Sequence, residues 1–288
     1  MVYFVRDMSC PDHSPVAGLA QRSVAHIVYF RTRPLPVLRI SLRIRVGEFY
    51  FSFMPPGEEC DVYAGLCLNE ARSGWSSHQR STRIIELDQP ENALLHACSK
   101  SNRYKIERAG RRDNVQTAFL SSPDERGLLE FAQYYDSFAA SKDIPPLRRD
   151  QFTALARAGN LVISTARTED GSVLAAHAYL VDQSRARLTH SASVFRLEAD
   201  SAERNRIGRT NRLLHWDDMI RLRGSGVKTY DLGGWYTGHR DQAQLRINSF
   251  KEEFGGRVVH EWDIFRAGST RGSLYLRGRN LAAAADVA

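Results

Sequence analysis

The chain has 288 residues, of which 42% are hydrophobic and 25% are charged, and its formal net charge is +7. This is the composition of a globular protein with one large core or two modest ones, and it excludes a largely disordered chain. No apolar run reaches the roughly eighteen residues of a membrane-spanning helix, and the N-terminus lacks the order of a secretory signal, so we expect a cytoplasmic protein without a transmembrane segment. The basic balance favours partners that carry phosphate.

The four cysteines, Cys10, Cys60, Cys67 and Cys98, form no CxxC pair and no zinc-type pattern with histidine. We therefore expect free thiols, no metal and no cysteine nucleophile. The sequence also lacks a G-x-S-x-G nucleophile motif. If the protein transfers a group, a direct displacement without a covalent enzyme intermediate is the expected route.

Near the N-terminus, residues 38–46 alternate between apolar and polar side chains, with Ile40, Ile44 and Val46 on the apolar side. A period of two with β-branched residues predicts one half-buried strand. An aromatic run over residues 49–53 continues this strand or pairs with it, and a Met-Pro-Pro-Gly turn follows.

The middle of the chain is predicted to be helical after a short strand at residues 83–88. Asp88 is the expected N-cap, with Pro90 in the first turn and Glu91 in capping-box register. Three helices are predicted in this region, at residues 88–108, 121–140 and 148–158.

From residue 160 the pattern changes to strands separated by turns, one of them an Asp-Gly turn at 170–171. An antiparallel meander is predicted, with strands at residues 160–167, 173–181 and 187–195. Helices and strands then alternate, at residues 208–223, 227–232, 242–254 and 257–265. A right-handed crossover would place the strand at 227–232 parallel to the third meander strand. The expected fold is α/β (α+β), with a mixed, mostly antiparallel sheet and helices on both faces.

The segment Asn205-Arg-Ile-Gly-Arg-Thr210 leaves a charged loop and opens the predicted helix at Gly208. A helix start exposes free backbone N–H groups and the positive end of the helix dipole, and glycine allows a phosphate to approach closely. Arg206, Arg209 and Arg212 add positive charge. The alternative is that Gly208 is only a flexible start of the helix.

This segment resembles the acyl-CoA motif of the GNAT superfamily, Q/R-x-x-G-x-G/A, with Asn205 and Thr210 at its two outer positions. Residues 230–234 (Y-D-L-G-G) and 250–256 (F-K-E-E-F-G-G) resemble the C-terminal half of Fem-type aminoacyltransferases. Residues 103–109 are similar to the basic R-x-x-I-R-R-A segment of those proteins and depart from it at Glu107.

The resemblance implies a GNAT-like domain over residues 86–266, preceded by a reduced N-terminal GNAT-like half or embellishment at 1–85 and followed by a C-terminal tail at 267–288. It implies transfer of an acyl or aminoacyl group from acyl-CoA or aminoacyl-tRNA to an amine. The backbone amides that would hold the pyrophosphate of the donor belong to Ile207, Gly208, Arg209 and Thr210.

Three residues are candidates for the chemistry. Lys251 would stabilise the oxyanion of the tetrahedral intermediate or contact a phosphate. Asp231, at the carboxyl end of a strand, would bind the acceptor amine or act as a base, and His190 would accept the proton of the amine. The structural alternatives are a surface lysine, a turn residue and a hydrogen-bonded core histidine.

Substrate contacts are expected from Arg103, Arg108, Gly233, Gly234, Tyr236 and His239. The glycine pair would let the strand splay and bring the backbone to the substrate, and the loop after it mixes aromatic residues with glycine. The two arginines belong to a basic helix that would hold phosphates, or else form a solvated face.

Three functions remain open from the sequence. The first is an N-acyltransferase that uses acyl-CoA. The second is an aminoacyl-tRNA-dependent transferase that forms a peptide bond on a cell-wall precursor or a natural product, with tRNA as a partner; Asn205 and the net charge favour it. The third is a non-catalytic binding module. In the first two the acceptor is a small-molecule or precursor amine.

Overall fold

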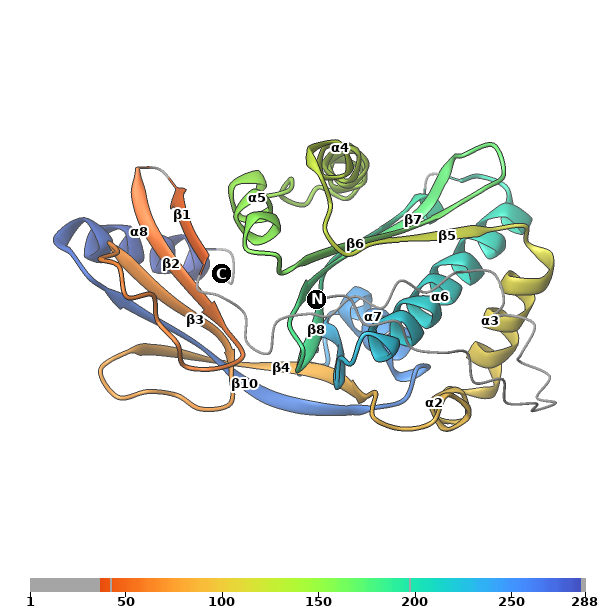
Figure 1. The fold of residues 1–288 in the computed structure, drawn as a ribbon, viewed down its shortest axis with the longest axis horizontal. Coiled ribbons are helices and arrows are strands. Elements are labelled where there is room, and N and C mark those ends of the chain that lie inside the picture. The colour runs from red at the N-terminus through yellow and green to blue at the C-terminus, as the bar shows by residue number, and fades with distance from the viewer. Residues whose placement is uncertain (1–36, 42, 197, 286–288) are drawn as a thin grey trace, which may run out of the picture.

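The computed structural model describes residues 37–41, 43–196 and 198–285, so the predictions for residues 1–36, including Cys10, lie outside the described part. In this part, ten strands form one sheet in the order β1-β2-β3-β10-β4-β9-β8-β7-β6-β5. The β2–β3 and β8–β9 pairs are parallel, and the other pairs are antiparallel. Figure 1 shows helices on both faces of the sheet. The predicted fold class is confirmed.

The strands are β1 (Val37–Ser41), β2 (Ile44–Tyr50), β3 (Val62–Leu68), β4 (Ser76–Glu86), β5 (Gln116–Leu120), β6 (Leu161–Arg167), β7 (Val173–Val181), β8 (Arg185–Ser193), β9 (Thr229–Gly234) and β10 (Arg257–Ala267). The helices are α2 (Glu91–Ala97), α3 (Lys100–Arg112), α4 (Glu125–Lys142), α5 (Arg149–Arg157), α6 (Ser201–Gly224), α7 (Gln242–Glu252) and α8 (Thr270–Ala285), with a 3₁₀ turn, η1 (Val194–Arg196). The predicted meander and the parallel placement of β9 beside β8 are confirmed.

The prediction of one strand over residues 38–46 is wrong, because β1 and β2 form a hairpin. Arg43 adopts a positive φ of 63° at its turn. The buried side of β1 is also the opposite of the expected one, since Ile40 is 70% exposed and Arg39 is buried. Arg39 tolerates burial because its Nε donates to Glu48 Oε1 at 2.8 Å.

The prediction of one helix over residues 88–108 is also wrong. Pro90, not Asp88, is the N-cap residue of α2, and no side chain caps it. The backbone is extended at Cys98, with ψ 147°, so α2 ends there. Helix α3 then begins with an N-cap residue of its own, Ser99. The Ser99 side chain accepts a hydrogen bond from the backbone N–H of Asn102 there.

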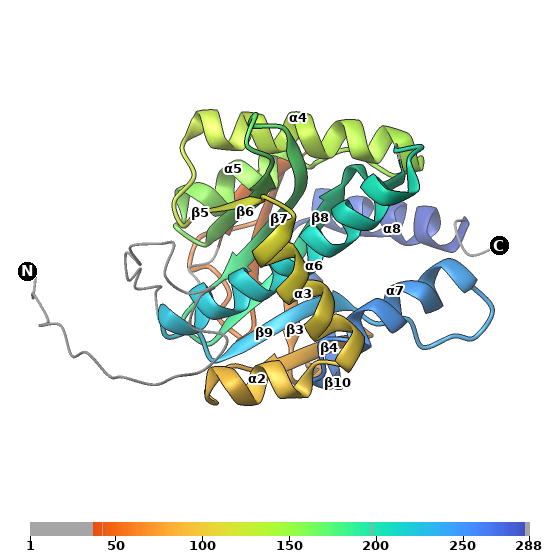
Figure 2. The same cartoon turned by 90° about the vertical axis from the view of Figure 1, so that its right-hand side faces the viewer.

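Two cores lie on opposite faces of the sheet. On one face α4 and α5 cover β6–β8, where the rings of Phe131 and Phe152 stack 5.5 Å apart. On the other face α6 packs beside α3, with Trp216 and Tyr230 among the buried side chains. Figure 2 shows α6 and α3 side by side. Because the sheet runs on through β4, the domain boundary near residue 85 stays a prediction.

Candidate active site

The parallel strands β8 and β9 pair over only part of their length. Both strands continue past the last pair, β8 to Ser193 and β9 to Gly234. The paired residues are Arg185 with Thr229, Ala186 with Tyr230, and Arg187 with Asp231. The ladder between the two strands therefore ends before their carboxyl ends, which is where ligands of open sheets collect.

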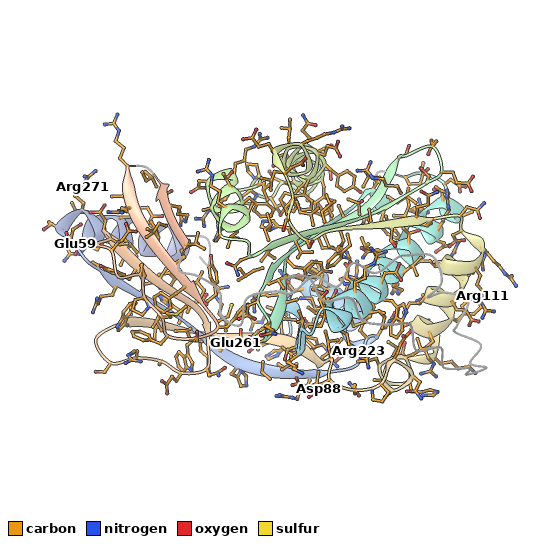
Figure 3. All side chains as sticks on the ribbon, viewed as in Figure 1. Glu59, Asp88, Arg111, Arg223, Glu261 and Arg271 are labelled. Carbon is orange, nitrogen blue, oxygen red and sulfur yellow. The ribbon has the colours of Figure 1, made fainter. Side chains whose placement is uncertain are left out.

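The paired half of β8 and β9 carries a buried cluster of four charges. Asp231 Oδ2 accepts hydrogen bonds from Arg187 Nη1 at 2.7 Å and from Arg185 Nε at 3.1 Å. Both arginines also pair with Glu261 of β10. Figure 3 labels Glu261 in the lower part of the molecule, and its contacts place it beside the first residues of β8.

This cluster contradicts the predicted catalytic role of Asp231. Its carboxylate is fully buried and also accepts hydrogen bonds from Thr82 and from the backbone N–H of Gly233. Burial raises the pKa of Asp231, but Arg187 and Arg185 outweigh it and hold that pKa below its usual value. A fully paired carboxylate of low pKa is a poor base and has no room for an amine.

Past the split, a pocket of about 440 Å³ opens between β8, β9, α6, α7 and the end of α4. Its apolar lining consists of Phe138, Leu188, Phe195, Leu232, Ile247 and Phe250. Its polar and cationic lining consists of Lys142, Asn211, Arg212, His215, Arg246 and Lys251, together with two serines of β8. An apolar cavity with a few convergent polar groups is the form that ligand sites usually take.

Lys251 lines this pocket, and its predicted catalytic role stays a proposal. It sits in the last turn of α7, and its Nζ donates to the backbone carbonyl of Gly234 at 2.5 Å. Burial lowers the pKa of Lys251 to about 8. The side chain is thereby fixed at the end of β9, where the strands have separated.

The predicted start of the helix at Gly208 is wrong. Helix α6 begins at Ser201, and the carboxylate of Asp200 caps it by accepting from the backbone N–H of Glu203 at 2.8 Å. The amides of residues 207–210 lie beyond the first turn, where backbone N–H groups donate within the helix. They are not available to hold a pyrophosphate, so this predicted cradle is not formed.

The side chains of the same four residues diverge. Ile207 and Thr210 are buried in the helix packing. The guanidinium of Arg209 makes a two-pronged contact with Asp113, at 2.7 and 2.9 Å. Only Gly208 lines the pocket, where a Cβ would meet the ring of Phe195 at 3.5 Å.

His190 faces the other side of the sheet. Its ring lies 4.8 Å from that of Tyr135 and 4.9 Å from that of Phe152, against α4 and α5. A bulge in β8 between Leu188 and His190 reverses the alternation, so these two residues do not share a side as the sequence pattern suggested. The prediction of His190 as the catalytic base is contradicted by this position.

The predicted substrate-binding residues do not gather in the pocket. Arg103 donates to the carbonyl of Cys98 at 2.5 Å and so joins α2 to α3, while Arg108 contacts Tyr104 on the surface. Tyr236 and His239 lie in the loop after β9, where Asn248 accepts from the backbone N–H of Tyr236. His239 is exposed.

The two predicted glycines sit at the split itself. Gly233 adopts a positive φ of 79°, and a Cβ there would lie 3.0 Å from the carbonyl oxygen of Leu188 on β8. Gly234 ends β9 and supplies the carbonyl that holds Lys251. Gly233 thus allows the backbone of β9 to approach β8 closely, and the predicted splaying of the strand and contact with substrate stay proposals.

Sequence reasoning missed a buried polar network that borders the pocket. His215 Nδ1 lies 2.7 Å from the hydroxyl of Tyr230, and this hydroxyl lies 2.8 Å from that of Tyr179. Tyr179 in turn donates to Asp218 at 2.6 Å. The sequence did contain a signal for His215. It follows Gly208 by two helical turns, so the two residues lie on the same face of α6.

The chain matches no protein-family model and no curated protein. Among solved structures it is similar to FemX, with a TM-score of 0.52 and 16% identity over 64% of this chain; it spans 61% of the FemX chain. It is also similar to the C-terminal domain of a protein assigned as a lysylphosphatidylglycerol synthetase from Agrobacterium fabrum, with a TM-score of 0.52, 14% identity and coverage of 93% and 92% of the two chains. The chain therefore has a fold like those of FemX and of this C-terminal domain.

The described residues also bear on membrane crossing, metal binding and the state of the cysteines. None of their helices combines the length and the apolar character needed to cross a membrane. They contain no group of three or more His, Cys, Asp or Glu side chains arranged to hold a metal ion. Cys60, Cys67 and Cys98 are free and buried.

Proposed function

We propose that this protein is an N-acyltransferase that moves an acyl or aminoacyl group directly onto an amine in the pocket past the β8–β9 split. The observation that carries the proposal is the separation of these two parallel strands directly beside Lys251. Unpaired strand segments offer backbone N–H and C=O groups, and an extended acyl donor can satisfy them.

The lining of the pocket suits a donor that is apolar at one end and anionic at the other. Leu188 and Leu232 come from the two separated strands and offer an apolar floor to the acyl chain. Arg246 and Lys251 supply positive charge at the same opening, while Arg212 pairs there with Glu253. Guanidinium groups bind phosphate with two parallel hydrogen bonds.

Lys251 is the group we assign to the oxyanion. Acyl transfer to an amine passes through a tetrahedral intermediate with a negative oxygen, and a fixed cation beside that oxygen lowers the barrier. The carbonyl of Gly234 holds the ammonium without neutralising it. The negatively charged oxygen therefore meets a full positive charge.

Acyl-CoA is the first candidate donor and aminoacyl-tRNA the second. The observation that favours the second is the early start of α6, which removes the amides expected to hold the pyrophosphate of CoA. A tRNA donor would instead rely on exposed cations such as Arg246. The acceptor amine enters from the same opening in both cases.

The test is a donor-binding titration with free CoA, acetyl-CoA and charged tRNA, followed by transfer to a panel of amines. Gly208→Leu fills the pocket from α6 and is expected to weaken donor binding at least tenfold. Gly224→Leu is the matched control, because it adds the same side chain to the same helix where a Cβ meets nothing within 4 Å. Equal binding by both variants, or no binding of any donor by the unaltered protein, would contradict the proposal.

A further inference from the structure

A chain of hydrogen bonds runs from the pocket into the core. It starts at His215 on α6, passes through the hydroxyls of Tyr230 and Tyr179, and ends at Asp218 Oδ2, over distances of 2.7, 2.8 and 2.6 Å. All four side chains are 1% exposed or less. Ser164 Oγ also donates to the same carboxylate oxygen, at 2.8 Å, and His177 Nδ1 lies 2.9 Å from it.

The hydrogen bond from Tyr179 to Asp218 gives this chain its direction. Tyr179 donates its single proton to Asp218 Oδ2, and His177 Nδ1 lies 3.0 Å from the same hydroxyl. Tyr179 then accepts from Tyr230, whose own proton is thereby used. Tyr230 can only accept from His215, which must carry its proton on Nδ1. The other ring nitrogen, Nε2, is left with a lone pair, and His215 lines the pocket.

We propose that His215 is the general base that accepts the proton of the acceptor amine, and that Tyr230, Tyr179 and Asp218 hold its ring and stabilise its protonated form. The inference rests on the proposed function and deepens it. Tyr230, Tyr179 and Asp218 act through His215 and are positioning residues.

The proposed step is balanced as follows. The lone pair of the neutral amine forms the N–C bond to the acyl carbon, and the carbonyl electrons move to oxygen beside Lys251. His215 Nε2 takes one proton from the nitrogen, which has become positive. The oxyanion then re-forms the carbonyl, and the thiolate or alkoxide leaves with the bonding pair of electrons. It receives the proton from Nε2, so His215 is restored.

Several groups face His215 and set its charge state. His177 of β7 lies ring to ring at 4.1 Å, Tyr230 faces it from β9, and Arg212 and Lys251 act on it from α6 and α7. Burial, and then His177, Arg212 and Lys251, hold the pKa of His215 well below its usual value. The ring is therefore neutral near pH 7, as a base must be.

The first experiment measures transfer by a His215→Asn variant with the best donor and amine. The asparagine amide keeps a donor toward Tyr230 and lacks Nε2. We expect kcat to fall about 10²- to 10⁴-fold, the donor Kd to change less than threefold, and the acid limb of the pH profile to disappear. Tyr230→Phe keeps Nε2, and we expect a fall of about tenfold with the acid limb moved to lower pH.

The second experiment needs no activity. Nitrogen-15 NMR of the His215 ring in the unaltered protein is expected to show the proton on Nδ1 at neutral pH. His96→Asn, an exposed substitution on α2, serves as the control for both measurements.

The outcomes separate the two proposals. If no donor and amine react, the proposed function and this inference both fail. If transfer occurs but His215→Asn keeps a folded structure, its activity and its acid limb, only the inference is overturned. A proton on Nε2 in the NMR measurement also overturns the inference alone.

Discussion

The two halves of the β8–β9 strand pair use charge in opposite ways. In the paired half, Asp231 and Glu261 each meet Arg185 and Arg187, so every buried charge has an opposite partner. In the separated half, the ammonium of Lys251 is bound to a neutral backbone carbonyl. One half stabilises the fold, and the other keeps a positive charge available.

This difference teaches how to separate structural from functional charges in a fold of this kind. A buried carboxylate with two guanidinium partners has no capacity left for a ligand. A cation that is half-buried and held by a neutral group retains its charge for an incoming anion. On this criterion we assign Asp231 to the fold and propose Lys251 for the site, although the sequence made both of them candidates.

The largest expected effect is the loss of stability when the charge cluster of the paired half is disrupted. Asp231→Ala would leave two buried guanidinium groups without one of their two carboxylates, and we expect a loss of about 3–5 kcal/mol in the free energy of unfolding. Denaturant unfolding measures it, with Asp170→Ala in the exposed turn after β6 as the control. A loss below about 1 kcal/mol would show that the cluster is not structural.

The next largest effect is the fall in kcat when the positive charge of Lys251 is removed. Lys251→Met keeps the length of the side chain and deletes the ammonium, and we expect kcat to fall about 10²-fold, or about 2.7 kcal/mol in the barrier, with the free energy of unfolding changed by less than about 1 kcal/mol. Steady-state kinetics and chemical unfolding measure the two quantities. A large loss of stability with unchanged kcat would move Lys251 into the structural class.

A smaller effect is the expected change in donor affinity with pH. Because the pKa of Lys251 is about 8, its charge is present below pH 8 and lost above it. We expect the affinity for free CoA to fall about tenfold, or about 1.4 kcal/mol, as the pH rises from 7 to 9. Lys251→Arg stays charged and should remove this decline; an unchanged decline would assign it to another group.

The smallest effect concerns His190, on the opposite face of the sheet. Its pKa falls from 6.5 to about 4, chiefly because it is buried. The unfolded chain therefore takes up the proton first, and stability falls as the pH drops from about 6.5 toward 4. His190→Leu also removes a buried Nδ1 that has no hydrogen-bond partner among the described residues. We therefore expect a change in stability within about 1 kcal/mol at pH 7 and a weaker fall of stability in acid. Unfolding at pH 7 and pH 5 tests both.

The sequence predicted the fold well where local patterns are decisive. The meander, the helices around α4 and α5, and the parallel crossover through α6 follow from periodicity and turns. The start of α6 was missed because residues 196–204 were interpreted as a charged loop, although Asp200 and Glu203 stand in capping-box register. β3 and β5 have short patterns that gave no clear signal.

The site was less predictable because its geometry depends on contacts between distant residues. Nothing local to Asp231 indicates that Arg185 and Glu261 will surround it. A single extra residue at the bulge in β8 moves His190 to the opposite face. The network from His215 to Asp218 joins one helix to strands β7 and β9, and only the folded chain brings these together.

The position of β10 in the sheet means that part of the sheet can form only late in folding. This strand lies between β3 and β4, so neither of them has its full set of hydrogen bonds until residues 257–267 are in place. Until then, two strand edges made early in synthesis stay open to pairing with other chains. Completion of the sheet is thus a late, long-range event, and a nascent chain that stops short of β10 is the species most prone to aggregate.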